Sequence, residues 1–209
     1  VRVKVPGTCG ELVQGIKENK NFHITCPINL FSYVSASLNS SQIEPSFIKP
    51  KAYQAMKKIL KFFHKENTKV NIQISSQIPM EKGMASSTAD IVGVCSSIAA
   101  LLGERISAEE IAKIPLSIEP TDGVMFREIV CFDHLEGKTS EIIGKPPRMK
   151  ILVIDPNICI NTMEFHKRID LTKLYLEIQN QNLKALKLVK RGIKEQNTKL
   201  IGEGATIST

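Results

Sequence analysis

The chain has 209 residues and a formal net charge of +7 at pH 7, with 42% hydrophobic residues, 5% aromatic residues and no tryptophan. This length allows one large domain or two small ones with a buried core, and the few aromatic rings argue against a base-stacking surface for nucleic acid. The lysines are spread along helix-like stretches, so we expect them on solvated helix faces and predict no nucleic-acid partner.

Strands dominate the predicted structure of the first forty residues. The alternation in VRVKV indicates a strand over 1–5, and PGTCG is expected to break it. Further strands are predicted over 11–15, 21–25 and 30–38.

The next part of the chain is predicted to form a helix, a strand and a second helix. Pro50 is expected to open the first helix, whose apolar side carries Tyr53, Met56, Leu60 and Phe63 at helical spacing. The alternation in KVNIQISSQIP predicts a strand that Pro79 stops. Helical periodicity over Ile91–Leu102 predicts the second helix, which should end at Gly103.

A third helix is predicted to begin at Ser107, which forms a capping-box pattern with Glu110, and Pro115 should kink or shorten it. EPTDG is expected to be a turn. Strands are predicted over REIVCFDH (127–134) and MKILVIDP (149–156), and the second should be buried because its middle is apolar. The last forty residues are rich in helix-like pattern, most clearly KALKLVKRGI.

The order of these elements predicts the fold class. The strands follow one another as hairpins do and do not alternate regularly with helices, which favours an α+β fold over a doubly wound sheet. The prolines of GKPPR suggest a boundary between a domain over 1–146 and a second over 147–209.

The cysteines bear on the compartment of the protein. Their number is odd and their spacing wide, with no CxxC pair; they are Cys9, Cys26, Cys95, Cys131 and Cys159. This pattern favours reduced thiols in a cytoplasmic protein over a disulfide framework or a zinc site. The longest apolar-rich stretch, Ile91–Leu102, is shorter than the roughly 20 residues that a membrane span needs, so we predict no membrane partner.

The stretch IPMEKGMASSTADI, from Ile78 to Ile91, reads as a strand end, a loop of small residues and a helix N-terminus. Free backbone N–H groups and the positive end of a helix dipole can bind phosphate there. The stretch is neither a Walker A loop nor a GxGxxG turn. From these residues alone, a serine-rich N-cap without a ligand is the favoured interpretation.

PMEKGMASSTA resembles the central motif of the GHMP kinase superfamily, whose pattern is Pro-x3-Gly-Leu-Gly-Ser-Ser-Ala. In that family, which includes galactokinase, homoserine kinase, mevalonate kinase and phosphomevalonate kinase, the loop wraps the phosphates of ATP, and a serine in it helps to hold Mg²⁺. The resemblance implies ATP and Mg²⁺ as cofactors and Ser87 as a metal ligand. It implies an ATP-binding set of Pro79, Lys82, Gly83, Met84, Ala85, Ser86, Ser87 and Thr88.

Three further blocks, PGTCGELVQG, CPIN and SIEPTD, make the chain most similar to a group within this family, the L-threonine kinases of cobalamin biosynthesis. This resemblance covers most of the first 135 residues in order. It implies transfer of a phosphoryl group from ATP to the hydroxyl of L-threonine, giving O-phospho-L-threonine for the aminopropanol linker of cobalamin.

The resemblance also implies roles for single residues. Glu119 would bind Mg²⁺ with Ser87, and Asp122 would act as a base or bind the acceptor, so these three form the predicted catalytic set. Cys9, Gly10, Glu11 and Asp122 would form the acceptor site. The alternatives are an ordinary Asp-capped turn at EPTD, a solvated strand charge at Glu11 and a packed small residue at Cys9.

The resemblance implies a GHMP kinase fold, with an S5-like N-terminal domain and a ferredoxin-like C-terminal domain. The third, glycine-rich motif of the family is not found, so we expect a C-terminal domain that is truncated in this sequence or that has lost the motif. The start at Val1, without Met, also suggests that residues are missing. Three alternatives stay open: a homoserine kinase, a non-catalytic sensor of the same fold, and a basic nucleic-acid module with the S5-like fold.

Overall fold

The computed structural model of this chain describes residues 1–38, 49–155 and 171–208. Its strands and helices alternate in short groups, and the sheet is antiparallel at every described pairing. The elements are β1 (Arg2–Lys17), β2 (Lys20–Leu38), α1 (Pro50–Phe62), β3 (Val70–Ser76), α2 (Ser86–Leu102), α3 (Ala108–Leu116), β4 (Ile129–Phe132), β5 (Ser140–Gly144), α5 (Leu171–Glu177), α6 (Gln179–Lys194) and α7 (Thr198–Ser208). The α+β prediction is confirmed.

Two long strands, β1 and β2, form the hairpin on which the rest of the molecule is built. The prediction that PGTCG breaks the first strand is wrong, because β1 continues through it in a ladder with β2. The register shifts between Pro6 and Thr8 and again on both sides of Glu11, and Gly10 adopts a φ of 61°. The motif therefore bulges within a continuous strand, as strands do near functional sites.

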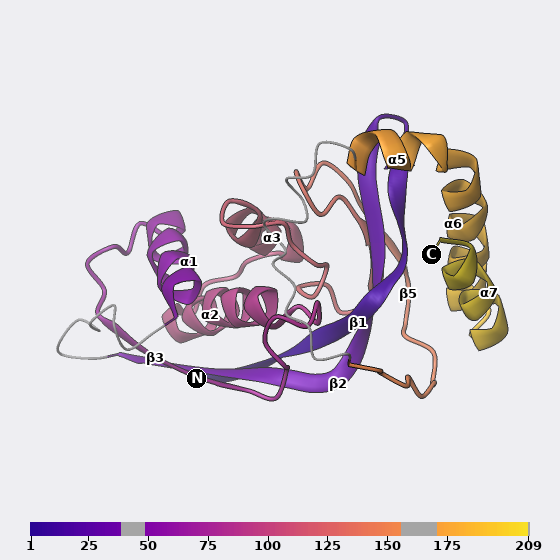
Figure 1. Ribbon diagram of the computed structural model, residues 1–209. Helices are drawn as coiled ribbons and strands as arrows, with labels where there is room; N and C mark the ends of the chain where they lie inside the picture. The colour runs from indigo at the N-terminus through magenta and orange to yellow at the C-terminus, as the bar shows by residue number, and fades with distance from the viewer. Residues whose placement is uncertain (39–48, 156–170, 209) are drawn as a thin grey trace.

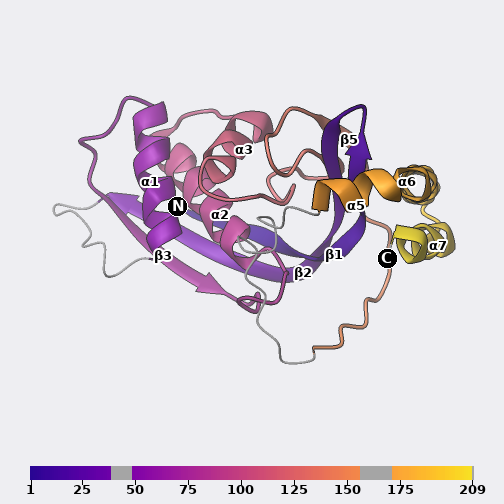
Figure 2. The same cartoon turned by 45° about the horizontal axis from the view of Figure 1, so that its top comes forward.

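One layer of helices covers the part of the sheet that contains β3 (Figures 1 and 2). The order of the sheet is β1-β2-β4-β5, with β3 paired to the C-terminal half of β2. Helices α1, α2 and α3 lie together on one face, and α2 is in the centre of the layer. Gly93 lets α2 approach the sheet closely, since a Cβ there would lie 2.4 Å from a methyl group of Val34.

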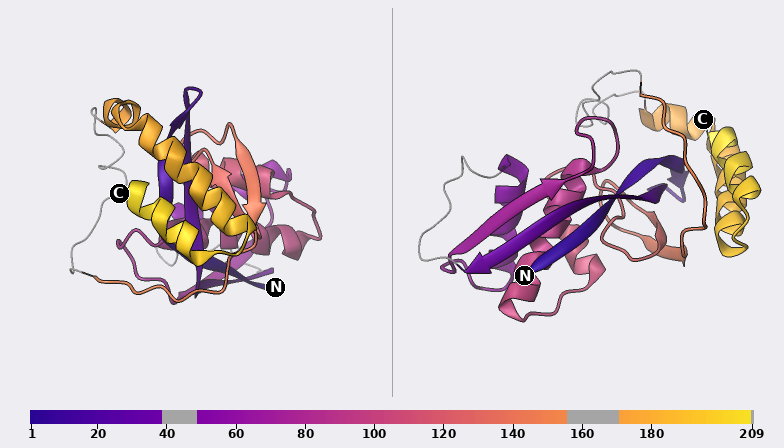
Figure 3. Two further views of the ribbon diagram at one scale, coloured as in Figure 1. Left: turned by 90° about the vertical axis from the view of Figure 1, so that its right-hand side faces the viewer. Right: turned by 90° about the horizontal axis from the view of Figure 1, so that it is seen from below.

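One apolar core lies between the sheet and helices α1, α2 and α3. A second apolar core lies at the other end of the hairpin. Helices α6 and α7 pack side by side across β1 and β2 (Figure 3). Val13, Phe22 and Ile24 of the hairpin meet Leu186 and Val189 of α6 there. Both cores share β1 and β2, while the predicted boundary after residue 146 lies between β5 and α5, and that boundary remains a prediction.

The predicted buried strand over MKILVIDP is wrong for its described part, residues 149–155, which form no strand. Leu152 is 87% exposed and Ile154 is 83% exposed. A strand requires a partner for its backbone N–H and C=O groups, and no described strand pairs with this run. Apolar composition indicated burial, but burial needs a neighbouring element, which the described part of the chain does not supply.

The remaining helix predictions agree with the structure in type, with one change of boundary. Pro50 begins α1, Ser107 and Glu110 form the capping box of α3, and Gly103 ends α2 with a φ of 72°. Helix α2 begins at Ser86 and not at Ile91, so the small hydroxyl residues form its first turn. Within the described ranges, no helix is long and apolar enough to cross a membrane.

Candidate functional site

The loop between β3 and α2 leaves a helix N-terminus open. Ala85, the residue before the helix, is left-handed with a φ of 59°, and no side chain caps the helix. The first helical bond runs from the Ala89 N–H to the Ala85 C=O at 2.9 Å. The N–H groups of the preceding turn, from Ser86 to Thr88, are therefore free of helical bonds and directed toward the loop.

Ser86 adds a second observation at this helix end. Its side chain is buried, and its hydroxyl has no hydrogen-bond partner in the described parts of the molecule. A buried hydroxyl without a partner costs stability, so such groups commonly mark a place that a ligand or water completes. No serine side chain caps the helix, and the free donors fit an anion such as phosphate.

The left-handed residue before α2 leads to a stability prediction. Ala85→Gly is expected to leave the free energy of unfolding unchanged or raise it by up to about 1 kcal/mol, because glycine adopts positive φ without strain. Ala85→Val should lower it by about 2 kcal/mol or more, since β-branched residues are strained there. Urea unfolding measures both.

The matched control for this prediction is Ala100→Gly, the same change at an exposed position of ordinary helical geometry in α2. It should lower the free energy of unfolding by about 1 kcal/mol. Equal losses for the two glycine variants would show that the left-handed turn at Ala85 is not maintained in solution.

The bulged motif of β1 packs directly against this loop. The Thr8 N–H donates to the Met84 C=O at 3.1 Å, and a Cβ at Gly7 would lie only 2.8 Å from the same oxygen. Three predicted acceptor residues follow Thr8 directly: Cys9, Gly10 and Glu11. The predicted ATP-binding and acceptor residues are thus brought together by a backbone contact.

The Cys9 thiol is not activated in this position. Burial raises its pKa, and the Glu11 carboxylate raises it further. Thiolates, not thiols, are nucleophiles. This agrees with the interpretation of Cys9 as a packed small residue. Cys26, Cys95 and Cys131 are also free and buried, and Cys159 lies outside the described residues.

The segment after α3 carries Asp122 to the same region. Thr121 anchors it, since its N–H donates to the His134 C=O at 2.9 Å and its hydroxyl donates to the Glu119 C=O at 3.0 Å. Burial raises the pKa of Asp122 to about 7, with further contributions from Glu11 and Glu119. Carboxylates from β1 and from this segment therefore act on one another, and together they favour a cation or a bound proton.

Glu119, the predicted metal ligand, forms an ion pair with Lys51 in the first turn of α1. A second pair lies nearby in sequence, where Lys49 meets Asp90 of α2 at 2.7 Å and Ser32 donates to the same carboxylate at 2.5 Å. Within the ranges described, no three metal-binding side chains gather closely enough to hold an ion. Glu119 can still supply one carboxylate to Mg²⁺, which commonly takes one or two protein ligands with phosphates.

Two further polar side chains lie near the site: Lys82, which the sequence predicted, and Tyr175, which it did not. Lys82, predicted to contact phosphate, lies 2.9 Å from the Asp155 carboxylate, and its side chain is only 18% exposed. Tyr175 of α5 is half-buried, and burial followed by the Glu11 charge raises the pKa of its hydroxyl. Helix α5 thus reaches the acceptor side of the site.

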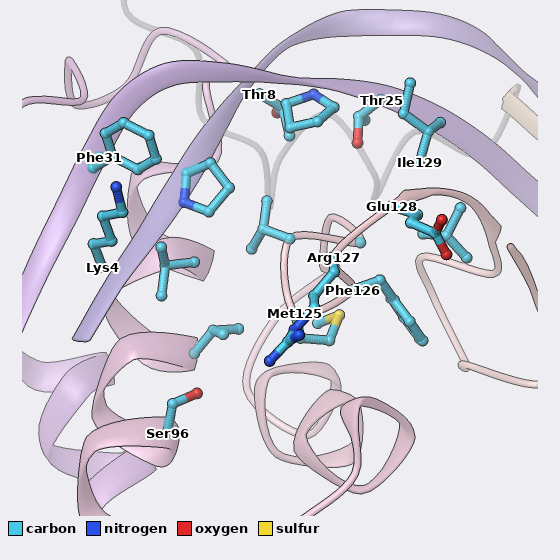
Figure 4. A pocket seen from close by; sticks show the side chains of 17 residues that line it. Lys4, Thr8, Thr25, Phe31, Ser96, Met125, Phe126, Arg127, Glu128 and Ile129 are labelled. Carbon is cyan, nitrogen blue, oxygen red and sulfur yellow. The ribbon is translucent and has the colours of Figure 1, made fainter. Parts of the chain in front are cut away.

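A pocket lies beside these residues, between the sheet and the helical layer (Figure 4). Its volume is about 330 Å³. Its lining combines charged and hydroxyl groups with apolar ones, including Lys4, Thr25, Ser96, Phe126 and Arg127. None of the predicted site residues lines it, but Thr8 and Gly123, which do, are the neighbours of Cys9 and Asp122.

Sequence reasoning missed two residues of this region, His23 and Lys51. His23 lies in the middle of a predicted strand and Lys51 near the start of a predicted helix, where each type is usually unremarkable. The period of two in NFHIT does place His23 opposite the apolar Phe22 and Ile24. This alternation is the sequence signal that could have pointed to His23. The partners of His23 and Lys51 come from the segment after α3, which lies far away along the chain.

Comparison with known proteins agrees with this arrangement. The sequence profile described as the GHMP kinases N terminal domain matches residues 50–126. The L-threonine kinase of Salmonella typhimurium is 30% identical over 207 residues, which is 97% of this chain and 67% of that protein. The L-threonine kinase of Citrobacter freundii is 28% identical over 206 residues, covering 97% of this chain and 70% of the relative.

The fold is also similar to that of solved kinases. The crystal structure of Methanococcus jannaschii mevalonate kinase superposes with a TM-score of 0.64 at 17% identity, covering 99% of this chain and 78% of that one. At that identity the likeness shows the fold alone, and the relationship itself comes from the sequence matches. This chain therefore belongs to the GHMP kinase family of small-molecule kinases.

Proposed function

We propose that this protein transfers the γ-phosphoryl group of ATP to the side-chain hydroxyl of L-threonine. The observation that carries the proposal is the interacting group of carboxylates of Glu11, Glu119 and Asp122. Glu11 lies on β1, whose Thr8 contacts the loop before the open N-terminus of α2. An amino acid acceptor has an ammonium group, which carboxylates attract, and ATP has phosphates, which the helix end attracts. The sequence similarity to L-threonine kinases, which extends over nearly the whole chain, supports the choice of acceptor.

The phosphate loop would hold the nucleotide. The free N–H groups from Ser86 to Thr88 and the buried Ser86 hydroxyl would donate to phosphate oxygens. Gly83, which has a φ of 65° and open space around its Cα, would let the backbone approach them. Bound Mg²⁺ would supply neutralisation of the phosphate charge during transfer. Ser87 and Glu119 are the residues that would hold it.

Asp122 would receive the proton of the acceptor. In the proposed step the threonine oxygen forms a bond to the γ-phosphorus, the bond to the leaving ADP oxygen breaks with its electron pair, and the hydroxyl proton passes to Asp122. A carboxylate with a pKa of about 7 is suited to this because the best base has a pKa near the working pH. Glu11 would hold the ammonium group of the amino acid.

An acceptor panel tests the proposal. ADP formation is measured with ATP, Mg²⁺ and, in turn, L-threonine, L-homoserine and L-serine. We expect kcat/KM for L-threonine to exceed the others by about tenfold or more. L-serine lacks one methyl group, which is worth roughly that factor, and L-homoserine carries its hydroxyl one carbon further from the α-carbon. A preference for L-homoserine would overturn the threonine assignment. ATP binding without turnover of any acceptor would indicate a non-catalytic sensor.

The use of the product is a further part of the proposal. The similarity to L-threonine kinases supports formation of O-phospho-L-threonine for the aminopropanol linker of cobalamin. Chromatographic identification of phosphothreonine in the reaction with L-threonine would support formation of the product that this use requires.

A further inference from the structure

A pair of stacked histidines lies behind Asp122. The rings of His23 and His134 are parallel to within 13°, with centroids 4.5 Å apart. Both residues are almost completely buried, with exposed fractions of 5% and 3%. The Nε2 atom of His23 lies 3.7 Å from Oδ1 of Asp122.

The fold explains how His23 reaches this place. On β2 the side chains of Phe22 and Ile24 point into the core with α6, so His23 between them points to the opposite face of the sheet. His23 pairs in register with Phe132 of β4, and His134 follows that strand by two residues. The His134 C=O also accepts the Thr121 N–H, so one residue supports both the ring of His23 and the backbone next to Asp122.

The distance from His23 to Asp122 is short enough for an electrostatic contact, whether the imidazole is neutral or protonated. It exceeds the 2.7–3.2 Å of ordinary N–H···O hydrogen bonds, although catalytic hydrogen bonds are commonly long before substrate binds. The other groups that act on Asp122 are the carboxylates of Glu11 on β1 and Glu119 in its own segment. Asp133, next to His134, accepts N–H bonds from its own loop, at Leu135, Glu136 and Lys138. The imidazole of His23 therefore favours the ionised form of Asp122, whereas the neighbouring carboxylates disfavour it.

We propose that His23 is a positioning residue of the kinase, which holds the Asp122 carboxylate in its ionised form and in one orientation toward the acceptor hydroxyl. The stack on His134 fixes the ring so that Nε2 faces the carboxylate. His23 takes no proton from the substrate; the proton stays on Asp122. This inference rests on the proposed function, in which Asp122 acts as a general base.

The kinetic test compares His23→Leu and His23→Gln with wild type. His23→Leu removes the polar edge, and we expect kcat at slightly acidic pH to fall by about 10–100-fold, with a smaller loss at alkaline pH. Without the imidazole the carboxylate binds its proton more tightly, so the acidic limb of the pH–rate profile should move to higher pH. His23→Gln keeps an N–H donor and should recover most of the rate. KM for ATP should not change.

His64→Gln is the matched control, since His64 is an exposed histidine after α1, and it should behave as wild type. An unchanged rate in His23→Leu would overturn the proposal. So would a loss that is equal at all pH values and accompanied by a lower Tm, because a purely structural role predicts that result.

A measurement without substrate separates this inference from the proposed function. The chain has only four histidines, so the imidazole signals can be followed by NMR during a pH titration. In Asp122→Asn the pKa of His23 should fall, because the carboxylate that favours imidazolium is gone. An unchanged His23 titration would refute the contact even if the enzyme phosphorylates threonine. Failure of the acceptor panel with a shifted His23 titration would refute only the proposed function.

Discussion

Asp122→Asn is expected to lower kcat for L-threonine by about 10²–10⁴-fold, the range typical of a lost general base. The amide has nearly the shape of the carboxyl group but cannot accept the proton of the hydroxyl. The Kd of ATP should stay within about twofold, since the phosphate loop is unchanged. Steady-state kinetics and ATP titration of the same preparation measure both quantities.

The pH dependence of the wild-type rate belongs to the same prediction. Burial and neighbouring carboxylates raise the pKa of Asp122 to about 7. The base must be ionised to act, so kcat should rise as pH increases through that value and then level off. In Asp122→Asn this acidic limb should be missing from the residual rate.

The control for Asp122→Asn is Glu136→Gln, which neutralises an exposed carboxylate on the loop after β4. It should leave kcat and its pH dependence as in wild type. Retention of near-normal kcat in Asp122→Asn would mean that Asp122 only positions the acceptor, or that its segment has another role.

Glu119→Gln is expected to lower kcat by about 10²-fold and to raise the Mg²⁺ concentration for half-maximal activity by about tenfold or more, because a neutral amide is a poorer ligand for a hard cation than a carboxylate. The change also leaves Lys51 without its ion-pair partner. The Lys51 side chain is 44% exposed, so that loss should cost no more than about 1 kcal/mol of stability.

Lys51→Met separates the two effects of Glu119→Gln. It breaks the same ion pair but keeps the carboxylate, so its Mg²⁺ dependence should be that of wild type or shifted to lower concentration. Equal loss of activity in both variants would show that Glu119 acts as the partner of Lys51 and not as a metal ligand. Mg²⁺ titration at saturating ATP and L-threonine gives the comparison.

Local signals predicted those elements whose structure depends on neighbours in the sequence. The capping box at Ser107 and the stop at Gly103 both concern hydrogen bonds within a few residues, and both are found. The loop after Pro79 was found in the same way, since glycine and small hydroxyl residues before a helical pattern describe an open helix end. Its left-handed Ala85 replaces the glycine of the family pattern and adopts the conformation that glycine favours.

Predictions failed where a second segment decides the outcome. PGTCG contains strand-breaking residues, but β1 pairs with β2 both before and after this motif, so the strand continues. MKILVIDP has the composition of a buried strand, yet residues 149–155 have no strand partner in the described part of the chain. Hydrophobic periodicity and composition describe a single segment, whereas a strand in a sheet also requires a second segment that pairs with it.

The sequence by itself determined the family of this protein, its α+β class and the position of the open helix end after Pro79, because these are recorded in short motifs and local periodicity. The tertiary structure alone decided that His23 faces Asp122 and that Lys51 pairs with Glu119 from 68 residues away. Such contacts depend on how β2, α1 and the segment after α3 pack together. The physical reason is that charge interactions follow distance in space, which separation along the chain does not specify.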